Sequence, residues 1–342
     1  MKNILDLTYE DLYLAVIADG EKKFRAAQIF DWIYKKRIYD FDSMNNIPAG
    51  TKRSLKNNYY LMLPEILERK ESKKDDSIRY MIGLDDGSTI EALLMKYRYG
   101  YSICISSQVG CRMGCAFCAS ADLGFIRNLT PGEFTGQVLT VEKNEHVKIS
   151  HIAVMGIGEP LDNFDNLMDF IDIANDSAGL NMSARNITVS TCGIVDRIRD
   201  IADRDIKINL ALSVHSANNE KRLSIMPVTN RFGTDAAIDA MKYHFRKTGR
   251  RPTYEYTLIK KFNDSPKDAA ELAEKIKGTP AHVNLIFLNE TGRNGYRRSD
   301  RTAALEFSNV LNKNGIEVTI RRRTGADIDA ACGQLKRDRG AE

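Results

Sequence analysis

The sequence predicts an α/β protein whose parallel sheet closes partly or fully into a barrel, preceded by a small helical module. From Tyr101 onward, short apolar segments of strand length alternate with longer helical stretches. This alternation is typical of a parallel sheet, because parallel neighbours need a crossover connection and a helix usually supplies it. Residues 1–75 lack the alternation and have helical patterns only. Cys, Gly, His and Ser follow the predicted strands, where barrel enzymes hold their active sites.

Composition indicates a folded protein outside the membrane. The 342 residues are 43% hydrophobic and 28% charged, which suits one large domain and a small one. No apolar run approaches the roughly 20 residues that span a bilayer, and the first residues form no secretory segment. We therefore expect a cytoplasmic protein whose six Cys are reduced and serve as ligands or catalysts. Net charge is only +4, but basic clusters at 246–251 and 293–339 suit phosphate contacts, although solvated surface charge explains any single one equally well.

Residues 1–75 are predicted to form the helical module. Thr8 followed by Asp11 is an N-cap pattern, and apolar residues recur with helical spacing over 24–34. Basic residues flank that second helix, which favours an RNA-holding module; a packing appendage fits the pattern nearly as well. The segment 68–76 is so rich in charge that we expect a linker or an exposed edge.

A β-hairpin is predicted next, from two apolar segments, 78–84 and 89–95, around an Asp-Asp-Gly turn. Glu91 lies within the second strand among apolar neighbours. Its carboxylate either faces solvent or has a function, and the pattern alone favours solvent.

The barrel elements follow in order. Thr130-Pro131 and Ser265-Pro266 are predicted helix starts, with a cap and a proline in the first turn, and Gly315 is predicted to end the last helix. The predicted strands are 102–106, 152–155, 187–190, 208–214, 253–258, 282–288 and 316–320.

The sharpest motif is formed by Cys111, Cys115 and Cys118, at the spacing C-x3-C-x2-C after the first barrel strand. Iron–sulfur clusters are normally held by four Cys thiolates, so three local ligands leave one iron open to a small molecule. A structural zinc site needs four protein ligands at paired short spacings, and the sequence offers no second pair and no nearby His. We therefore predict a cluster with one open position.

The ends of the later strands are also polar. Glycines there let backbone approach a ligand, and carboxylate, hydroxyl, amide and imidazole groups suit a nucleoside with an amino-acid head. Each segment alone is weak evidence for a ligand site, since a tight turn has a similar sequence. Together, however, the segments are predicted to face the barrel mouth that holds the Cys loop. The segments are 156–160, 190–193, 213–216 and 289–290.

Cys332 lies near the C-terminus among small residues, beyond the final strand. An inert buried Cys is often the safer interpretation of such a residue. Small neighbours in a tail would, however, let this thiol enter the barrel mouth, where Cys104 ends the strand before the cluster motif. Two thiols that can meet favour reversible disulfide chemistry.

Three runs carry a family resemblance: 104–118, 155–163 and 327–335. The Cys spacing with Phe117 before the last Cys resembles the signature of the radical S-adenosylmethionine (SAM) superfamily. From about residue 20 to 336 the chain resembles the RlmN/Cfr family of that superfamily, with closer similarity to the RlmN type. The resemblance implies an N-terminal helical domain (1–75), a hairpin linker (76–97), a partial (β/α)6 radical-SAM, TIM-like barrel (98–320) and a C-terminal catalytic tail (321–342).

The same resemblance implies the site. Cys111, Cys115 and Cys118 would hold one [4Fe-4S] cluster. Cys332 would carry a methyl group as S-methylcysteine, Cys104 would be the resolving thiol, and Glu91 would accept a proton, against the orientation that its pattern favours. The SAM contacts would be Gly158, Glu159, Ser190, Ser213, Val214, His215 and Asn289.

The activity that this resemblance implies is methylation at C2 of adenosine 2503 in the peptidyl transferase centre of 23S rRNA, and of adenosine 37 in some tRNAs. In the family, one SAM methylates the tail Cys and a second yields a radical that activates the methyl group. A flavodoxin- or ferredoxin-type reductant is implied, because the sequence has no second cluster motif. A monomer with no membrane partner is expected.

Three alternatives remain at this stage. A Cfr-like enzyme would methylate C8 of the same adenosine and give antibiotic resistance; Pro160 after Glu159 resembles the C2 branch instead. A radical SAM peptide modifier would usually need further Cys motifs, and a non-catalytic RNA-binding module would need none. Two departures from the family are Glu290, where many relatives have Pro, and the unusual segment 119–124, which would allow an atypical substrate preference.

Overall fold

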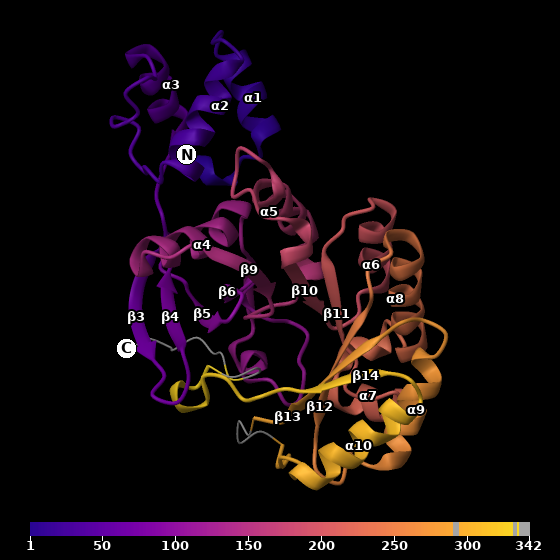
Figure 1. Cartoon of the computed structure of the whole chain (residues 1–342). Coiled ribbons are helices and arrows are strands. Elements are labelled where there is room, and N and C mark those ends of the chain that lie inside the picture. The colour runs from indigo at the N-terminus through magenta and orange to yellow at the C-terminus, as the bar shows by residue number, and fades with distance from the viewer. Residues whose placement is uncertain (290–293, 331–333, 335–342) are drawn as a thin grey trace.

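The computed structural model describes residues 1–289, 294–330 and 334. Glu290 and Cys332 therefore lie outside the described residues. A ten-stranded mixed sheet forms the centre of the molecule, in the order β14-β13-β12-β11-β10-β9-β6-β5-β4-β3 (Figure 1). The part from β6 to β14 is parallel, and β3, β4 and β5 extend it as an antiparallel meander.

The parallel strands confirm the seven predicted from the sequence. Their side chains alternate between the core and the concave side of the sheet, and the core-facing positions are Ile, Leu, Val and Tyr. The strands are β6 (Gly100–Ile105), β9 (Ile149–Val154), β10 (Ile187–Thr191), β11 (Asn209–Ser213), β12 (Thr253–Leu258), β13 (His282–Phe287) and β14 (Glu317–Ile320).

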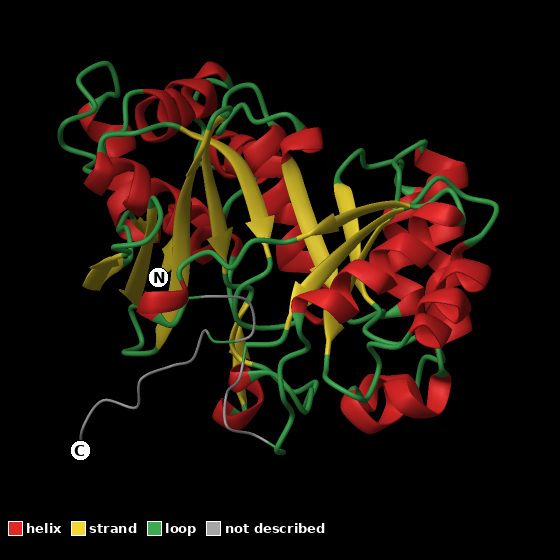
Figure 2. Ribbon diagram, turned by 60° about the horizontal axis from the view of Figure 1, so that its bottom comes forward, coloured by secondary structure: helices red, strands yellow, loops and turns green. Residues whose placement is uncertain are grey.

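A layer of helices joins successive strands and covers the outside of the curved sheet (Figure 2). The predicted starts are confirmed, because Thr130 with Glu133 and Ser265 with Asp268 form complete capping boxes. Gly315 follows the last helix with φ of +75°, as a C-terminal glycine should. The helices are α4 (Pro131–Glu145), α5 (Phe164–Asn175), α6 (Val195–Asp203), α7 (Asn219–Ile225), α8 (Thr234–Thr248), α9 (Pro266–Ile276) and α10 (Arg301–Lys313). In the described part of the chain, no helix is both long and apolar enough to cross a membrane.

The predicted hairpin is confirmed as β4 (Ser77–Gly83) and β5 (Thr89–Tyr97). For the charged segment 68–76, the expected exposed edge is confirmed in residues 68–71. β3 (Glu65–Glu71) pairs with β4 and forms the edge of the sheet, so the helical pattern predicted for residues 1–75 ends before this strand. Ile66 packs against the core, but β3 has few other apolar residues, so the alternation that marks a strand is missing. Charge on an edge strand protects it from pairing with other chains.

The N-terminal helices pack on the barrel beside α4 (Figure 1). Asp6 accepts a hydrogen bond from the backbone N–H of Gly132 at 2.9 Å, in the first turn of α4. Gly132 permits this approach, since a Cβ there would lie 2.7 Å from the Asp6 carboxylate. The module comprises α1 (Tyr9–Ala18), α2 (Phe24–Phe30), the π-helix η2 (Asp31–Lys35) and α3 (Ala49–Asn58), and the short strands β1 (Lys2–Asn3) and β2 (Tyr59–Tyr60) pair beneath it.

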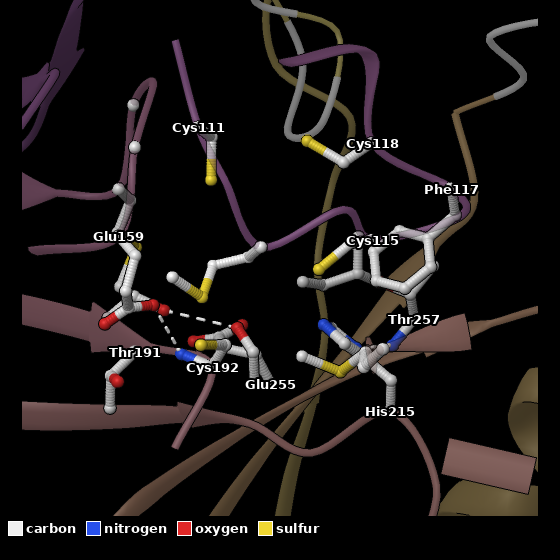
Figure 3. Close-up of a pocket in the computed structure, with 18 of the residues that line it drawn as sticks. Cys111, Cys115, Phe117, Cys118, Glu159, Thr191, Cys192, His215, Glu255 and Thr257 are labelled. Carbon is white, nitrogen blue, oxygen red and sulfur yellow. Dashed lines mark hydrogen bonds between the residues drawn. The ribbon is translucent and has the colours of Figure 1, made fainter. Parts of the chain in front are cut away.

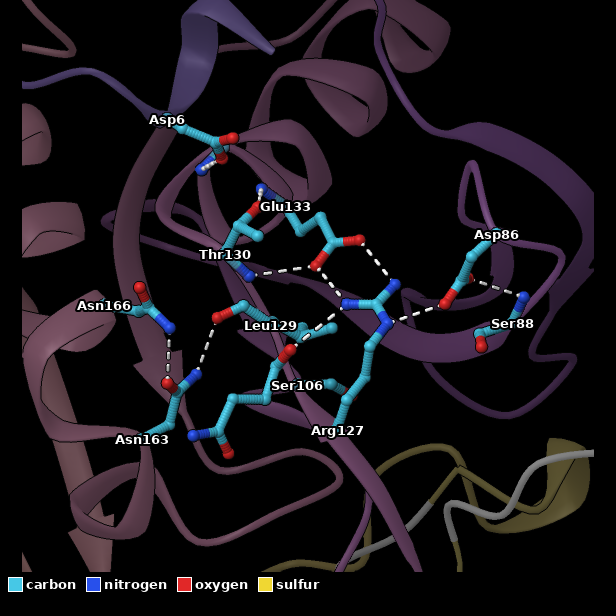
Figure 4. A network of polar contacts seen from close by, with 12 residues as sticks. Asp6, Asp86, Ser88, Ser106, Arg127, Leu129, Thr130, Glu133, Asn163 and Asn166 are labelled. Atoms are coloured by element: carbon cyan, nitrogen blue, oxygen red, sulfur yellow. Dashed lines mark hydrogen bonds and ion pairs between the residues drawn. The ribbon is translucent and has the colours of Figure 1, made fainter. Parts of the chain in front are cut away.

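A polar network fixes the same end of α4 to the loops beside the site (Figure 4). Arg127, on the short strand β8 (Phe125–Asn128), binds Glu133 with two nitrogens, each at 2.8 Å, and Asp86 at 2.6 Å. Asn163 donates to the carbonyls of Ser107 and Leu129. These contacts tie the segment around the Cys motif to the barrel wall.

His244 on α8 makes the stability of the barrel sensitive to acid. It is 1% exposed, and neither ring nitrogen has a hydrogen-bond partner among the described residues. Burial, with Arg250 and Lys207 nearby, lowers the pKa of His244 from 6.5 to about 4. The unfolded chain therefore binds the proton first, so stability should fall as the pH drops from 6.5 toward 4, by roughly 3 kcal/mol from this group. Urea unfolding across this range should show a smaller decline for His244→Met; an unchanged decline would contradict the assignment.

Candidate active site

Two adjoining cavities open at the carboxyl ends of the parallel strands, where barrel enzymes hold their sites. They share part of their lining, including Cys118, Met155 and Asn289. The first cavity is lined by the three motif cysteines and by six predicted SAM residues: Gly158, Glu159, Ser190, Ser213, His215 and Asn289. The second contains Cys104 and residues of the C-terminal tail.

The Cys loop lies over the first cavity with all three sulfurs on its lining (Figure 3). The loop is fixed from below, because the N–H of Ala116 donates to the carbonyl of Ile225 at the end of α7. Phe117 packs edge-on against the ring of His215, with 4.8 Å between ring centroids. The aromatic residue of the motif therefore joins the Cys loop to the fourth parallel strand.

The thiols fit a cluster better than a free thiolate site. Burial raises the pKa of Cys111 to about 12 and raises the pKa of Cys115 further. These thiols therefore stay protonated until a bound metal takes the place of the proton. No three His, Cys, Asp or Glu side chains of the described residues stand close enough together to hold a single metal ion. A cluster instead takes each thiolate on a different iron.

Glu159 faces the first cavity and is 4% exposed. Its carboxylate accepts a hydrogen bond from the backbone N–H of Cys192 at 2.8 Å (Figure 3). It accepts another from the backbone N–H of Leu161 at 3.1 Å. Burial nevertheless raises the pKa of Glu159, because the two amides only partly offset desolvation. A ligand with a positive charge would stabilise the carboxylate.

His215 presents one defined tautomer. Its Nδ1 accepts a hydrogen bond from the N–H of Thr257 at 2.9 Å, so in the neutral ring Nε2 carries the proton. Burial lowers the pKa of His215 to about 3, which keeps the ring neutral at physiological pH. The φ of His215 is +50°, in the left-handed region that residues other than Gly seldom adopt. Such backbone conformations cluster at functional sites.

Among the other predicted SAM residues, Ser190, Ser213 and Gly158 line the first cavity, and Val214 does not. The hydroxyls of Ser190 and Ser213, on neighbouring strands, lie 3.4 Å apart and line the cavity together. Gly158 has φ of +107°, and a Cβ there would lie 2.6 Å from the hydroxyl of Ser107. Val214 is not on the cavity wall: its side chain is in the core, and its N–H and carbonyl are bonded to Glu255 and Arg222.

Sequence reasoning missed two residues of this site, Glu255 and Arg222. Glu255 on β12 is 4% exposed and lines the first cavity; its Oε1 accepts from Asn284, and its Oε2 lies 3.8 Å from Arg321. Arg222 on α7 is fully buried beneath the strand ends. It donates to the carbonyls of Cys192, Ser213 and Val214 and to the hydroxyl of Thr229. The sequence gives no sign of either role, because a single acid in a strand and a single Arg in a helix are common in any protein.

The second cavity brings Cys104 beside the tail. Cys104 pairs with Leu93 across β5 and β6, and both line this cavity with Ala330. Arg321, Arg322 and Arg323 form a basic rim on it. Such a rim suits a phosphate-bearing substrate.

Glu91 is 2% exposed, so the solvent-facing orientation that its pattern favoured is wrong. It lies on β5 on the same face as Leu93, two residues nearer the mouth, and its carboxylate pairs with Arg79 at 3.2 Å. Arg79 is also buried and pairs with Glu68 on β3. Buried charges need such partners, and the strands β3, β4 and β5 supply these two ion pairs.

The sequence matches two described families. Residues 2–61 match the ribosomal RNA large subunit methyltransferase N-terminal domain, and residues 105–273 match the Radical SAM superfamily. The barrel and its Cys loop thus define a radical SAM protein, a class whose members use a [4Fe-4S] cluster and SAM. The donor set fits both, with three thiols for the cluster and a buried carboxylate for a cationic ligand.

Similar proteins define the family further. The chain is 47% identical over 337 residues to a probable dual-specificity RNA methyltransferase RlmN of Clostridium perfringens (strain SM101 / Type A), covering 98% of this chain and 97% of that one. It is 47% identical over 338 residues to the same kind of protein from Clostridium novyi (strain NT), covering 99% and 98%. The crystal structure of a radical SAM methyltransferase from Sphaerobacter thermophilus matches with a TM-score of 0.92 and 36% identity, covering 98% and 99%. The chain belongs to the RlmN family of radical SAM RNA methyltransferases.

Proposed function

We propose that this RNA methyltransferase methylates C2 of adenosine 2503 in 23S rRNA, and adenosine 37 of some tRNAs, through a methyl group carried on Cys332. The observation that carries the proposal is the pair of adjoining cavities, one with the three motif cysteines and one with Cys104. An electron-poor ring carbon such as adenine C2 is no nucleophile, so direct transfer from SAM would not methylate it. A carrier Cys, a resolving Cys and radical chemistry remove that difficulty.

Cys111, Cys115 and Cys118 would hold the [4Fe-4S] cluster, since their sulfurs line the same cavity. SAM would occupy the rest of it, with Glu159 and His215 as its buried polar partners. When bound, the cluster and SAM supply the methyl group and a 5′-deoxyadenosyl radical. Ser190, Ser213, Gly158 and Asn289 would complete the contacts, whereas Val214 would support the wall from behind.

The reacting side chains are proposed to meet at the second cavity. The S-methyl group of Cys332 would lose a hydrogen atom to the 5′-deoxyadenosyl radical, and its carbon would then bond to C2 of the base. Cys104 would then attack the sulfur of Cys332, which releases the methylated base and leaves a disulfide. Glu91 would take the proton from C2, and its ion pair with Arg79 holds the buried carboxylate in one place. Ala330, two residues before Cys332 in the chain, lines the cavity with Cys104.

The partners follow from this chemistry. The basic rim at 321–323 would hold substrate phosphates, and RNA affinity would then fall steeply with salt. A flavodoxin- or ferredoxin-type reductant would supply electrons, and we propose that the protein acts as a monomer in the cytoplasm. The C8 position remains the second candidate, because the same cysteines would serve it; Pro160 after Glu159 favours C2.

Nucleoside mass spectrometry tests the proposal. The reconstituted enzyme would be given SAM, reductant and unmethylated 23S rRNA without oxygen, and the digest compared with both isomeric standards. We expect 2-methyladenosine. The C8 isomer would move the enzyme to the other branch, and SAM cleavage without either product would overturn the substrate assignment.

A further inference from the structure

The C-terminal tail crosses the mouth of the sheet from one edge to the other. β14 ends at Ile320 on one edge, and residues 321–324 then line the cavities on the way to the opposite edge, formed by β3 and β4 (Figure 1). The tail there forms the short helix η7 (Ala326–Ile328). The turn between β3 and β4, residues 72–76, meets it.

Asp327 is held by this turn through both carboxylate oxygens. Oδ1 accepts a hydrogen bond from the hydroxyl of Ser72 at 2.7 Å, and Oδ2 accepts one from the backbone N–H of Lys73 at 2.9 Å. The Ser72 hydroxyl in turn accepts from the N–H groups of Lys74 and Asp75. The turn is therefore folded around the Ser72 hydroxyl, which also binds Asp327 of the tail.

Asp75 adds a second attachment in the opposite direction. Its Oδ2 accepts the backbone N–H of Gly325 at 2.9 Å, while its Oδ1 accepts the N–H of Ser77. A carboxylate of the tail thus binds the turn, and a carboxylate of the turn binds the tail. Gly325 has φ of +65°, where a side chain would also come within 3.0 Å of Ala330.

The underside of the attached segment is apolar. Ile328 and Ala330 are buried against Leu93 and Ile157, and Cys104 packs beside this cluster. The segment also closes on itself, since the N–H of Ala330 donates to the carbonyl of Gly325 at 2.9 Å. Residues 325–330 therefore have one defined shape and one defined place beside Cys104.

We propose that the β3–β4 turn is a latch that sets the position of the tail, with Asp327 and Asp75 as positioning residues for methyl transfer. This rests on the proposed function only in that Cys332 follows Ala330 by two residues. β14 fixes the start of the tail at one edge of the sheet. The latch fixes the tail again at the opposite edge, beside the substrate cavity.

Breaking the latch should uncouple SAM cleavage from methyl transfer to the RNA. In Asp327→Ala, the first cavity keeps its lining, and SAM cleavage should stay within about twofold of wild type. A misplacement of about 1 Å can cost up to about 100-fold in rate, so methyladenosine formed per 5′-deoxyadenosine should fall at least about tenfold. Asp327→Asn should be intermediate, because one amide oxygen still accepts but the amide nitrogen cannot. Ser72→Thr, which keeps the hydroxyl, should retain most of the coupling.

Asp76→Ala is the matched control, since it removes an exposed carboxylate of the same turn, next to Asp75 in the chain. Hydrogen exchange of the amides of Gly325, Ile328 and Ala330 provides a readout that needs no activity. We expect faster exchange in Asp327→Ala and wild-type exchange in Asp76→Ala.

The outcomes separate the latch from the proposed function. If the wild-type enzyme methylates no adenosine, the proposed function fails, and hydrogen exchange alone decides the latch. If Asp327→Ala leaves exchange unchanged, there is no latch. If exchange rises while coupling stays at the wild-type value, the turn anchors the tail but does not position it for reaction, and the positioning role is wrong.

Discussion

Cys104→Ala is expected to abolish release of methylated RNA, by at least about 1,000-fold, while iron content stays at the wild-type level. Cys104 lines the second cavity, whereas Cys111 and Cys115 line the first. The proposed step needs its thiolate to attack the sulfur of Cys332, and a methyl side chain cannot do so. The base should then remain joined to Cys332. Gel electrophoresis under denaturing conditions should show a covalent protein–RNA species in this variant.

Two further variants sharpen this result. Cys332→Ala should give neither product nor covalent species, again with full iron content. Ser102→Ala, two residues earlier on β6, should remain active, since Ser102 lies on the same strand away from the cavity lining. Loss of iron in Cys104→Ala would make this residue a cluster ligand and contradict the division between the two cavities.

Arg222→Met is expected to destabilise the barrel by about 4 kcal/mol or more and to weaken SAM binding. The guanidinium is fully buried and donates to three strand-end carbonyls and to Thr229. Its removal leaves those acceptors buried without a donor, at about 1–3 kcal/mol each. The same carbonyls belong to Cys192, Ser213 and Val214, so the cavity wall should shift with them. Denaturant unfolding and SAM titration measure the two effects.

Arg222→Lys should lie between wild type and Met, because one ammonium group keeps the charge but cannot reach four acceptors in a planar arrangement. Arg53→Met on α3 is the matched control, as Arg53 is exposed and should change stability by less than about 0.5 kcal/mol. Equal stability of Arg222→Met and Arg53→Met would show that the buried contacts contribute nothing.

Much of the fold could be predicted, because its signals are local. Apolar periodicity located all seven parallel strands, and Thr130 and Ser265 marked helix starts through capping groups within three residues. The sequence left β3 open as a linker or an exposed edge, since Ile66 and Leu67 are its only apolar residues. Its pairing with β4 is what makes it a strand.

The site divides in the same way. By itself the sequence determined the radical SAM class, through three Cys at the spacing C-x3-C-x2-C and polar segments at the strand ends that line the same cavity. Only the tertiary structure decided the surroundings: the burial of Glu91, the roles of Glu255 and Arg222, and the attachment of Asp327 to the β3–β4 turn. The three Cys of the motif can be recognised in the sequence because they lie close together in one short loop. A buried charge or an anchoring carboxylate is defined by its partner, and the partner of Asp327 lies 255 residues away in the chain.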